Sequence, residues 1–212
     1  RPPPLRLPRA RPPRLLRLAT AMEQLWLAGN LGEGRRWLND ALAHAPEATL
    51  ERARALHTAG SLATFQQAHA EARQLINESL TLSSSLNDEA GESWAGLSLG
   101  LIEFVADDPI EATRHLKRSL AMHEARGDRL GVCRSLIFLA TALTHISASK
   151  EQGRIELKRA LLAAHQLEDG WGEGFALLFL GFADADAGER ELAATHFRGA
   201  LLTDALGPVR AG

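Results

Sequence analysis

Strand-forming and sulphur-containing residues are scarce in this sequence. Its 212 residues include no Tyr, seven Phe and one Cys. Aromatic and β-branched residues favour strands, whereas Ala, Leu, Arg and Glu, which are abundant here, favour helices. We therefore expect an all-α protein, and 45% hydrophobic residues are enough to bury a sizeable core.

The single cysteine, Cys133, excludes an intrachain disulfide and a thiolate-based zinc site. It lies in the apolar run from Cys133 to Leu143, where a small buried residue fits. We expect a core thiol rather than a nucleophile.

Long apolar runs are also missing. A membrane-spanning helix needs roughly 18 apolar residues, and the longest candidate, residues 175–183, is about half that length. The sequence therefore predicts a soluble, cytoplasmic protein without a membrane partner.

The short motifs that mark many catalytic sites are absent from the sequence. It has no GxxxxGK[ST] phosphate loop, no HExxH metal pair and no GxSxG nucleophile turn. Its eight His include no pair spaced i, i+4, and His115 and His196 share a repeat position that indicates a half-buried structural role. We expect no enzymatic activity, no metal and no cofactor.

Basic residues are concentrated near the N-terminus. The first 17 residues carry six Arg and no acid, whereas the rest of the chain has 18 basic and 26 acidic residues. Phosphate contacts need a basic face, so we do not expect the folded domain to bind nucleic acid. Six prolines within residues 1–13 predict a disordered tail, which is either a basic arm for nucleic acid or another anionic surface, or a linker. We expect a tail at 1–13, a helical repeat domain at 14–206 and a flexible C-terminus at 207–212.

An internal repeat of 38 to 41 residues is the main signal in the sequence. Five segments share a small residue, an apolar residue four positions later, a small residue three after that and then a Leu. These steps place the four side chains on one face of a helix. The five sets are Gly34/Leu38/Ala41/Leu42, Ala72/Ile76/Ser79/Leu80, Ala112/Leu116/Ser119/Leu120, Gly153/Leu157/Ala160/Leu161 and Ala193/Phe197/Ala200/Leu201.

A second small position recurs 12 or 13 residues before four of these segments. It is held by Gly60, Gly100, Ala140 and Gly181, and Met22 stands at the matching place in the first repeat. A small residue there lets a partner helix approach closely, so each repeat is predicted to be an antiparallel helix pair. About five such pairs would stack into a right-handed superhelical solenoid. The expected helices span 14–28, 33–45, 49–65, 69–86, 90–105, 109–125, 130–146, 150–167, 171–186 and 189–205.

This arrangement resembles tetratricopeptide (TPR) repeats in their longer form. More narrowly, EGRRWLNDAL at residues 33–42, with repeats that close in LND, RGDRLG and LEDGWGEG, resembles the C-terminal repeat region of large LuxR-type and antibiotic-regulator-type ATP-dependent bacterial transcriptional activators. The resemblance covers about residues 18–206. It implies a region that senses a ligand or partner, while separate domains hydrolyse ATP and bind DNA.

The TPR resemblance also implies where binding takes place. In such repeats the first helix of each pair lines the concave face, so residues at fixed offsets from the small position face the groove. The candidate binding residues are Arg54, His57, Trp94, Leu101, Arg134, Thr141, His145, Phe175 and Phe182. Arg54 and Arg134 would hold a carboxylate or phosphate of the partner, or else pair with acids such as Glu51 or Glu103.

Two of the predicted groove helices are apolar nearly all round, at residues 94–106 and 175–183. Either adjacent helices cover their second face, or the aromatic residues form an exposed patch. The sequence thus predicts a module that binds a protein, a peptide or a small effector, as the sensing region of a larger regulator. The alternatives are a ligand or peptide receptor that acts on its own and a homo-oligomerisation scaffold, for example a homodimer.

Overall fold

The computed structural model describes residues 12–203, and this part of the chain contains helices and no strand. It divides into two compact units, one up to Ala95 and one from Gly96, and the division falls inside α6 (Glu89–Val105). None of the helices described is long and apolar enough to cross a membrane. The prediction of an all-α protein is confirmed.

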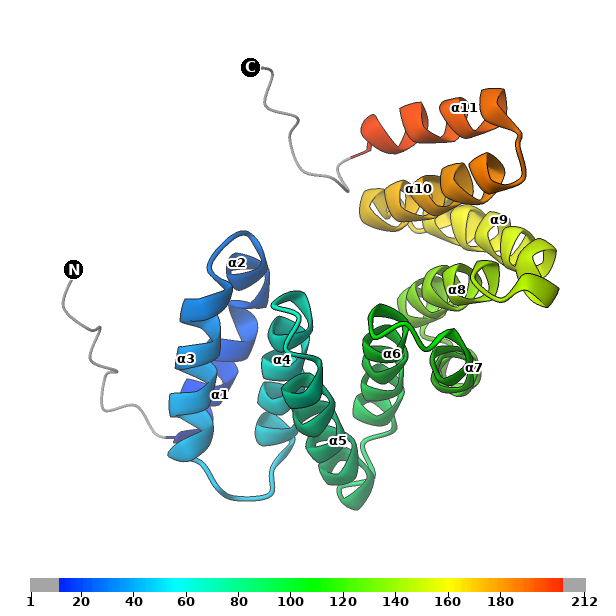
Figure 1. The fold of residues 1–212 in the computed structure, drawn as a ribbon. Helices are drawn as coiled ribbons and strands as arrows, with labels where there is room; N and C mark the ends of the chain where they lie inside the picture. The colour runs from blue at the N-terminus through cyan, green and yellow to red at the C-terminus, as the bar shows by residue number, and fades with distance from the viewer. Residues whose placement is uncertain (1–11, 204–212) are drawn as a thin grey trace. The chain divides into compact units, whose positions relative to one another are not determined.

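Unit 1 is built from helices that pack on their neighbours in the chain. They are α1 (Pro12–Ala21), α2 (Glu23–Leu27), α3 (Leu31–Ala43), α4 (Leu50–Phe65), α5 (His69–Ser85) and the first part of α6. Helix α1 contacts both α3 and α4, and α4 packs against α5 (Figure 1). Leu16, Trp26, Leu38, Leu56 and Leu62 fill the core between them.

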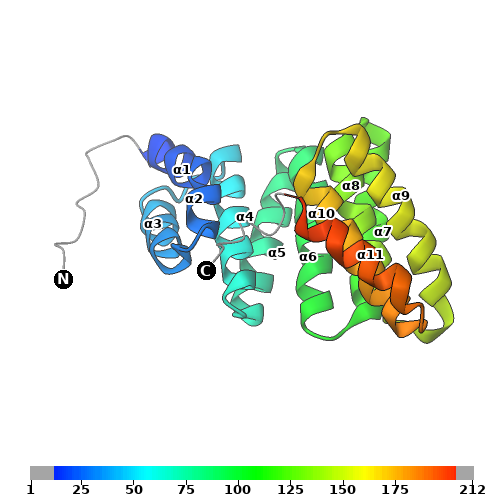
Figure 2. The same cartoon turned by 90° about the horizontal axis from the view of Figure 1, so that it is seen from above.

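Unit 2 continues the same pattern. After the second part of α6 come α7 (Pro109–Arg126), α8 (Arg129–Thr144), the short 3₁₀ helix η1 (Ser147–Ser149), α9 (Lys150–Gln166), α10 (Gly170–Asp186) and α11 (Arg190–Leu201). Each of α8, α9 and α10 packs on the helix that follows it, and α8 also contacts α10. Figures 1 and 2 show α6, α8 and α10 following one another along one side of this unit. Ile137, Leu157 and Leu180 are fully buried in its core.

The recurrent small residues do what the repeat pattern predicts. A Cβ added at Gly60 would lie 2.6 Å from Cδ1 of Ile76, and one at Gly100 would lie 2.4 Å from Cγ of Leu116. Gly181 meets Phe197 in the same way, at 2.5 Å. Each small residue therefore admits the apolar side chain of the second helix of its own pair.

The first repeat departs from this arrangement. The single helix predicted at 14–28 is wrong, because the structure breaks it at Met22 into α1 and α2. Trp26 fills the space beside Gly34, where a Cβ would lie 2.5 Å from its ring, and its Nε1 donates a hydrogen bond to the carbonyl of Ala19 at 3.0 Å. The bulky pair of Met22 and Trp26 takes the place of the small residue found in the other repeats.

The other helix boundaries agree with the prediction to within a few residues. Helix α1 begins at Pro12, inside the predicted tail, and the predicted helix 130–146 ends at Thr144 with η1 after it. The remainder of the predicted tail and the predicted flexible C-terminus fall on residues 1–11 and 204–212, which lie outside the described residues.

Six of the turns share one geometry. A residue one or two positions after the last residue of the helix has a left-handed backbone, with φ between 53° and 81°. The N–H of the residue that follows it donates to the carbonyl five residues earlier. This is the Schellman arrangement, which satisfies carbonyls left open at a helix end. The left-handed residues are Gln67, Asn87, Asp107, Gly127, Glu168 and Gly188.

Candidate functional site

A pocket of about 300 Å³ lies in unit 1, between α1, α2, α4, α5 and α6. We name it the Trp94 pocket. Its lining includes Thr20, Glu23, Arg54, His57, Ser83 and Trp94. Three of the predicted binding residues, Arg54, His57 and Trp94, are therefore brought together here.

Glu23 is the mostly buried acid of the Trp94 pocket. Burial raises the pKa of its carboxyl group, although a hydrogen bond from Thr58 Oγ1 at 3.4 Å acts in the opposite direction. Within the described part of the chain it forms no ion pair. The carboxylate is thus poorly solvated and lacks a cation.

His57 holds the pocket wall. Burial lowers the pKa of its imidazole, and a hydrogen bond to the backbone of Trp94 opposes that shift. His57 is therefore neutral at pH 7. Because His57 belongs to α4 and Trp94 to α6, this hydrogen bond fixes the aromatic wall of the pocket relative to α4.

Two hydroxyl groups at the Trp94 pocket are buried without a hydrogen-bond partner among residues 12–203. They are Thr20 Oγ1 and Ser83 Oγ, and Ser83 as a whole is 1% exposed. Buried hydroxyls are normally paired with protein atoms or with a bound molecule, so these two mark a place where a polar group fits.

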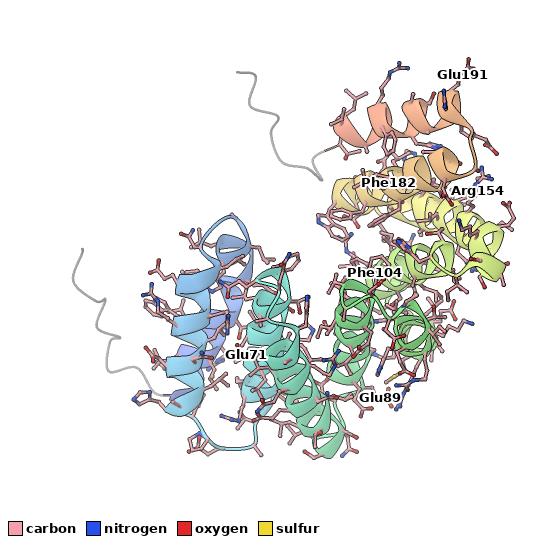
Figure 3. All side chains as sticks on the ribbon, in the orientation of Figure 1. Glu71, Glu89, Phe104, Arg154, Phe182 and Glu191 are labelled. Atoms are coloured by element: carbon pink, nitrogen blue, oxygen red, sulfur yellow. The ribbon has the colours of Figure 1, made fainter. Side chains whose placement is uncertain are left out.

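A second pocket, of about 570 Å³, lies in unit 2. We name it the Phe182 pocket. Its wall combines the aromatic rings of Phe104, Phe179 and Phe182 with the polar residues Thr141, His145, Lys150 and Asp186. Three predicted binding residues, Thr141, His145 and Phe182, are brought together in it. Figure 3 labels two of its aromatic residues, Phe104 on α6 and Phe182 on α10.

Phe182 is unusually open for an aromatic residue, with 57% of its surface exposed. One side of its ring packs edge-on against Phe197, with centroids 5.2 Å apart. On the opposite part of the wall, Phe104 meets His145 edge-on at 5.0 Å. The rings are thus held in place while Phe182 presents apolar surface to the hollow.

The polar side of the Phe182 pocket is also fixed. His145 Nδ1 bonds the carbonyl of Thr141 at 3.0 Å, and Thr141 Oγ1 donates to the carbonyl of Ile137 at 2.7 Å. Lys150 pairs with Asp186, and this hydrogen bond lowers the pKa of the Asp186 carboxyl group. The ion pair places one positive and one negative charge beside an apolar hollow.

The other predicted binding residues lie outside both pockets. Arg134 pairs with Asp169, with Nη1 and Oδ2 2.9 Å apart, and its guanidinium lies 3.7 Å from the ring centre of Trp171. Phe175 stacks on the same Trp171 ring, with the ring centroids 4.1 Å apart. Leu101 is half-buried on α6. In this structure Arg134 uses its charge to join α8 to the start of α10.

Sequence reasoning missed Glu23, Ser83 and Lys150. Glu23 belongs to the first repeat, where the pattern is weakest. Ser83 lies on α5 and Lys150 is the first residue of α9, and both of these are the second helix of a pair. The offsets taken from TPR repeats apply only to the first helix of each pair, so they do not identify binding residues on the second helix. The described residues contain no group of three or more His, Cys, Asp or Glu placed to hold a metal ion.

The sequence matches no model of a known protein family, and no curated protein matches it. Several solved structures are similar in fold. BtubC (BKLC) from P. vanneervenii matches with a TM-score of 0.71 and 15% identity, over 89% of this chain and 79% of that chain.

Two further structures have similar scores. A putative kinesin light chain with nearly identical TPR-like repeats from Podosopora anserina gives 0.68 and 14% identity, over 93% and 97% of the two chains. The apo form of RapI gives 0.68 and 12% identity, over 89% of this chain and 82% of RapI. The fold is therefore that of a TPR-like helical repeat protein.

Proposed function

We propose that this chain is a binding module whose Phe182 pocket receives an apolar side chain of a protein or peptide partner. The observation that supports this function most strongly is the 57% exposure of Phe182 on the wall of a 570 Å³ hollow. Apolar anchors that enter well-packed pockets dominate the energetics of most protein interfaces.

The chemistry of the wall suits a peptide. Apolar surface from Phe104, Phe179 and Phe182 accommodates the anchor, and Lys150 and Asp186 stand beside it. Either charge can exchange its partner for a charge next to the anchor, which adds orientation more than affinity. Pockets of this size bury most of a side chain and part of the adjoining backbone.

The test is peptide selection with the whole chain as bait, followed by affinity measurement with fluorescently labelled selected peptides. Phe182→Ser is expected to weaken binding about tenfold or more. Ile110→Ser is the matched control, because Ile110 is 70% exposed on α7 and lies outside the pocket. Circular dichroism of both variants verifies that the helices remain.

Phe182→Ser also removes the contact between Phe182 and Phe197, so a second variant that keeps this contact is needed. Ser147 is exposed in η1 and lines the hollow, so Ser147→Trp fills the space without removing a core contact. Binding that survives both Phe182→Ser and Ser147→Trp would exclude the Phe182 pocket as the site.

We further propose that the module is the cytoplasmic sensing region of a larger bacterial transcriptional regulator. The support is the resemblance of residues 33–42 and of the repeat endings to regulators of the LuxR and antibiotic-regulator types. The coding sequence around this chain in its genome tests it. A phosphate-binding loop and a helix-turn-helix motif are expected there, and a gene without either contradicts the proposal.

A further inference from the structure

The Trp94 pocket holds charges of both signs that do not pair with each other. Glu23 and Arg54 both line it, yet they form no ion pair with each other within 4.0 Å, and neither forms an ion pair with any other residue that the structure describes. Charges of opposite sign that share one pocket without pairing complement a ligand that carries both signs as well.

The surroundings of the two charges differ. Glu23 is mostly buried, whereas Arg54 is exposed on α4. A cation of the ligand would enter the pocket and meet Glu23, and an anion would remain near the better solvated guanidinium of Arg54. A primary ammonium group is small enough for the buried position and brings several N–H donors.

A cluster at the start of α6 adds further partners for such an ammonium group. Ser83 Oγ and Asp88 Oδ2 lie 2.3 Å and 2.7 Å from the place where a Cβ of Gly91 would be, so both approach the same glycine. Asp88 also lines the pocket and supplies a second acidic group. The hydroxyls of Ser83 and Thr20, which have no hydrogen-bond partner in the described structure, can accept or donate a hydrogen bond.

We propose that the Trp94 pocket binds a small zwitterion, of the size of a free amino acid, with its ammonium group at Glu23 and its carboxylate at Arg54. The indole of Trp94 forms an apolar wall for the rest of the ligand. The pocket volume of about 300 Å³ is at the lower end of the range found for small-molecule sites. This inference goes beyond the proposed function, since it concerns the other unit and a different kind of ligand.

The experiment begins with the whole chain and each of the standard L-amino acids in a thermal-shift assay. The amino acid with the largest effect is then compared by calorimetry with its C-terminal amide and its N-acetyl derivative, which keep one charge each. The zwitterion is expected to bind about tenfold or more tightly than either derivative. Equal affinity of the three compounds, or no shift with any amino acid, overturns the proposal.

Two variants assign the charges. Arg54→Gln is expected to reduce affinity for the amino acid and leave that for its amide unchanged, and Glu23→Gln is expected to spare only the N-acetyl derivative. Arg36→Gln and Glu47→Gln are matched controls at exposed positions outside the pocket.

The third variant, Ser83→Ala, removes a hydroxyl that has no partner in the described structure. It is expected to leave the unfolding temperature of the free chain unchanged or slightly raised, and to weaken ligand binding about two- to tenfold. Unchanged ligand affinity in Ser83→Ala and in both charge variants overturns the assignment of this pocket. Because peptide binding at the Phe182 pocket is measured with other variants, failure of either proposal leaves the other to be judged separately.

Discussion

The carboxylate of Asp184, which is fully buried, receives a hydrogen bond from Nη2 of Arg154 at 2.7 Å. His196 Nδ1 bonds the other oxygen of Asp184 at 2.6 Å. Since Arg154, Asp184 and His196 belong to α9, α10 and α11, one acid joins three consecutive helices. His196 thus has the half-buried structural role that its repeat position predicts.

Replacing Asp184 tests how much this junction contributes. Asp184→Asn leaves Arg154 and His196 without their shared buried anion, and we expect a loss of about 3 kcal/mol in the free energy of unfolding. Lys150→Met is the matched control, because Lys150 and Asp186 join the same two helices, α9 and α10, at exposed positions. It should change stability by less than about 0.5 kcal/mol. Urea unfolding of the two variants measures both values.

The close approach of α6 and α7 gives a second prediction. Gly100→Ala places a Cβ 2.4 Å from Leu116 Cγ, so one of the helices has to move, and we expect a loss of about 1–3 kcal/mol. Gly32→Ala, on the exposed side of α3 with its nearest neighbour at 3.9 Å, should be neutral or slightly stabilising. Equal effects of the two substitutions would show that Gly100 does not serve close packing.

The left-handed turn residue Gln67 predicts a substitution that stabilises the chain. Its φ is 59°, a conformation that costs free energy for a side chain with a Cβ but not for Gly. We expect Gln67→Gly to raise the free energy of unfolding by about 0.5–1 kcal/mol. The same change at Gln74, which is exposed within α5, should lower it by about 1 kcal/mol, because Gly is a poor helix former. Thermal and urea unfolding would show the opposite signs.

The buried histidine His123 makes stability depend on pH. Burial lowers the pKa of His123 from its usual value of 6.5, and Asp128, 2.9 Å from its Nδ1, opposes the shift. A group with a lowered folded pKa binds protons more readily when unfolded, so its contribution to stability is complete above pH 6.5 and is lost as the pH falls below that value. We expect urea midpoints to fall between pH 7 and pH 5.5.

The variant His123→Gln should flatten part of that pH dependence. His165→Gln is the matched control, because the side chain of His165 is 76% exposed. His57, whose pKa burial also lowers, accounts for a further part of the slope. A slope that His123→Gln leaves unchanged contradicts the assignment of this effect to His123.

Cys133 provides a probe of opening in unit 2. It is fully buried, as the sequence predicts, and burial raises the pKa of its thiol to about 11. Only the thiolate reacts with disulfide reagents, so labelling in native buffer should be slow and should accelerate with urea as the helices open. Rapid, complete labelling of the native chain would contradict the burial of this thiol.

The repeat made most of the fold predictable from the sequence. Gly60, Gly100 and Gly181 recur at a fixed distance before the apolar stripe, so the pairing of each with Ile76, Leu116 and Phe197 follows from spacing alone. The first repeat was predicted less well, because it has the large residue Met22 where the other repeats have Gly or Ala, and because Trp26 fills the space beside Gly34. The turn at Gln67 carries no Gly or Asn, and therefore gives no signal in the sequence.

The two pockets were predicted only in part. Residues at regular offsets on the first helices, such as His57, Trp94 and Phe182, were found because periodicity fixes the face on which they lie. Glu23 and Lys150 reach the pockets from outside that pattern, and their positions depend on the packing of side chains. Arg134 has the positive charge needed to bind an anion of a partner, but in this structure it pairs with Asp169 and stacks on Trp171. Residue spacing does not reveal these contacts.

The most direct test of the binding function is a crystal structure of the chain with a peptide selected for it. We predict an apolar peptide side chain in contact with Phe104, Phe179 and Phe182, with the neighbouring peptide backbone beside Lys150 and Asp186. A peptide bound elsewhere on the helices, with the Phe182 pocket empty, would contradict the proposed function.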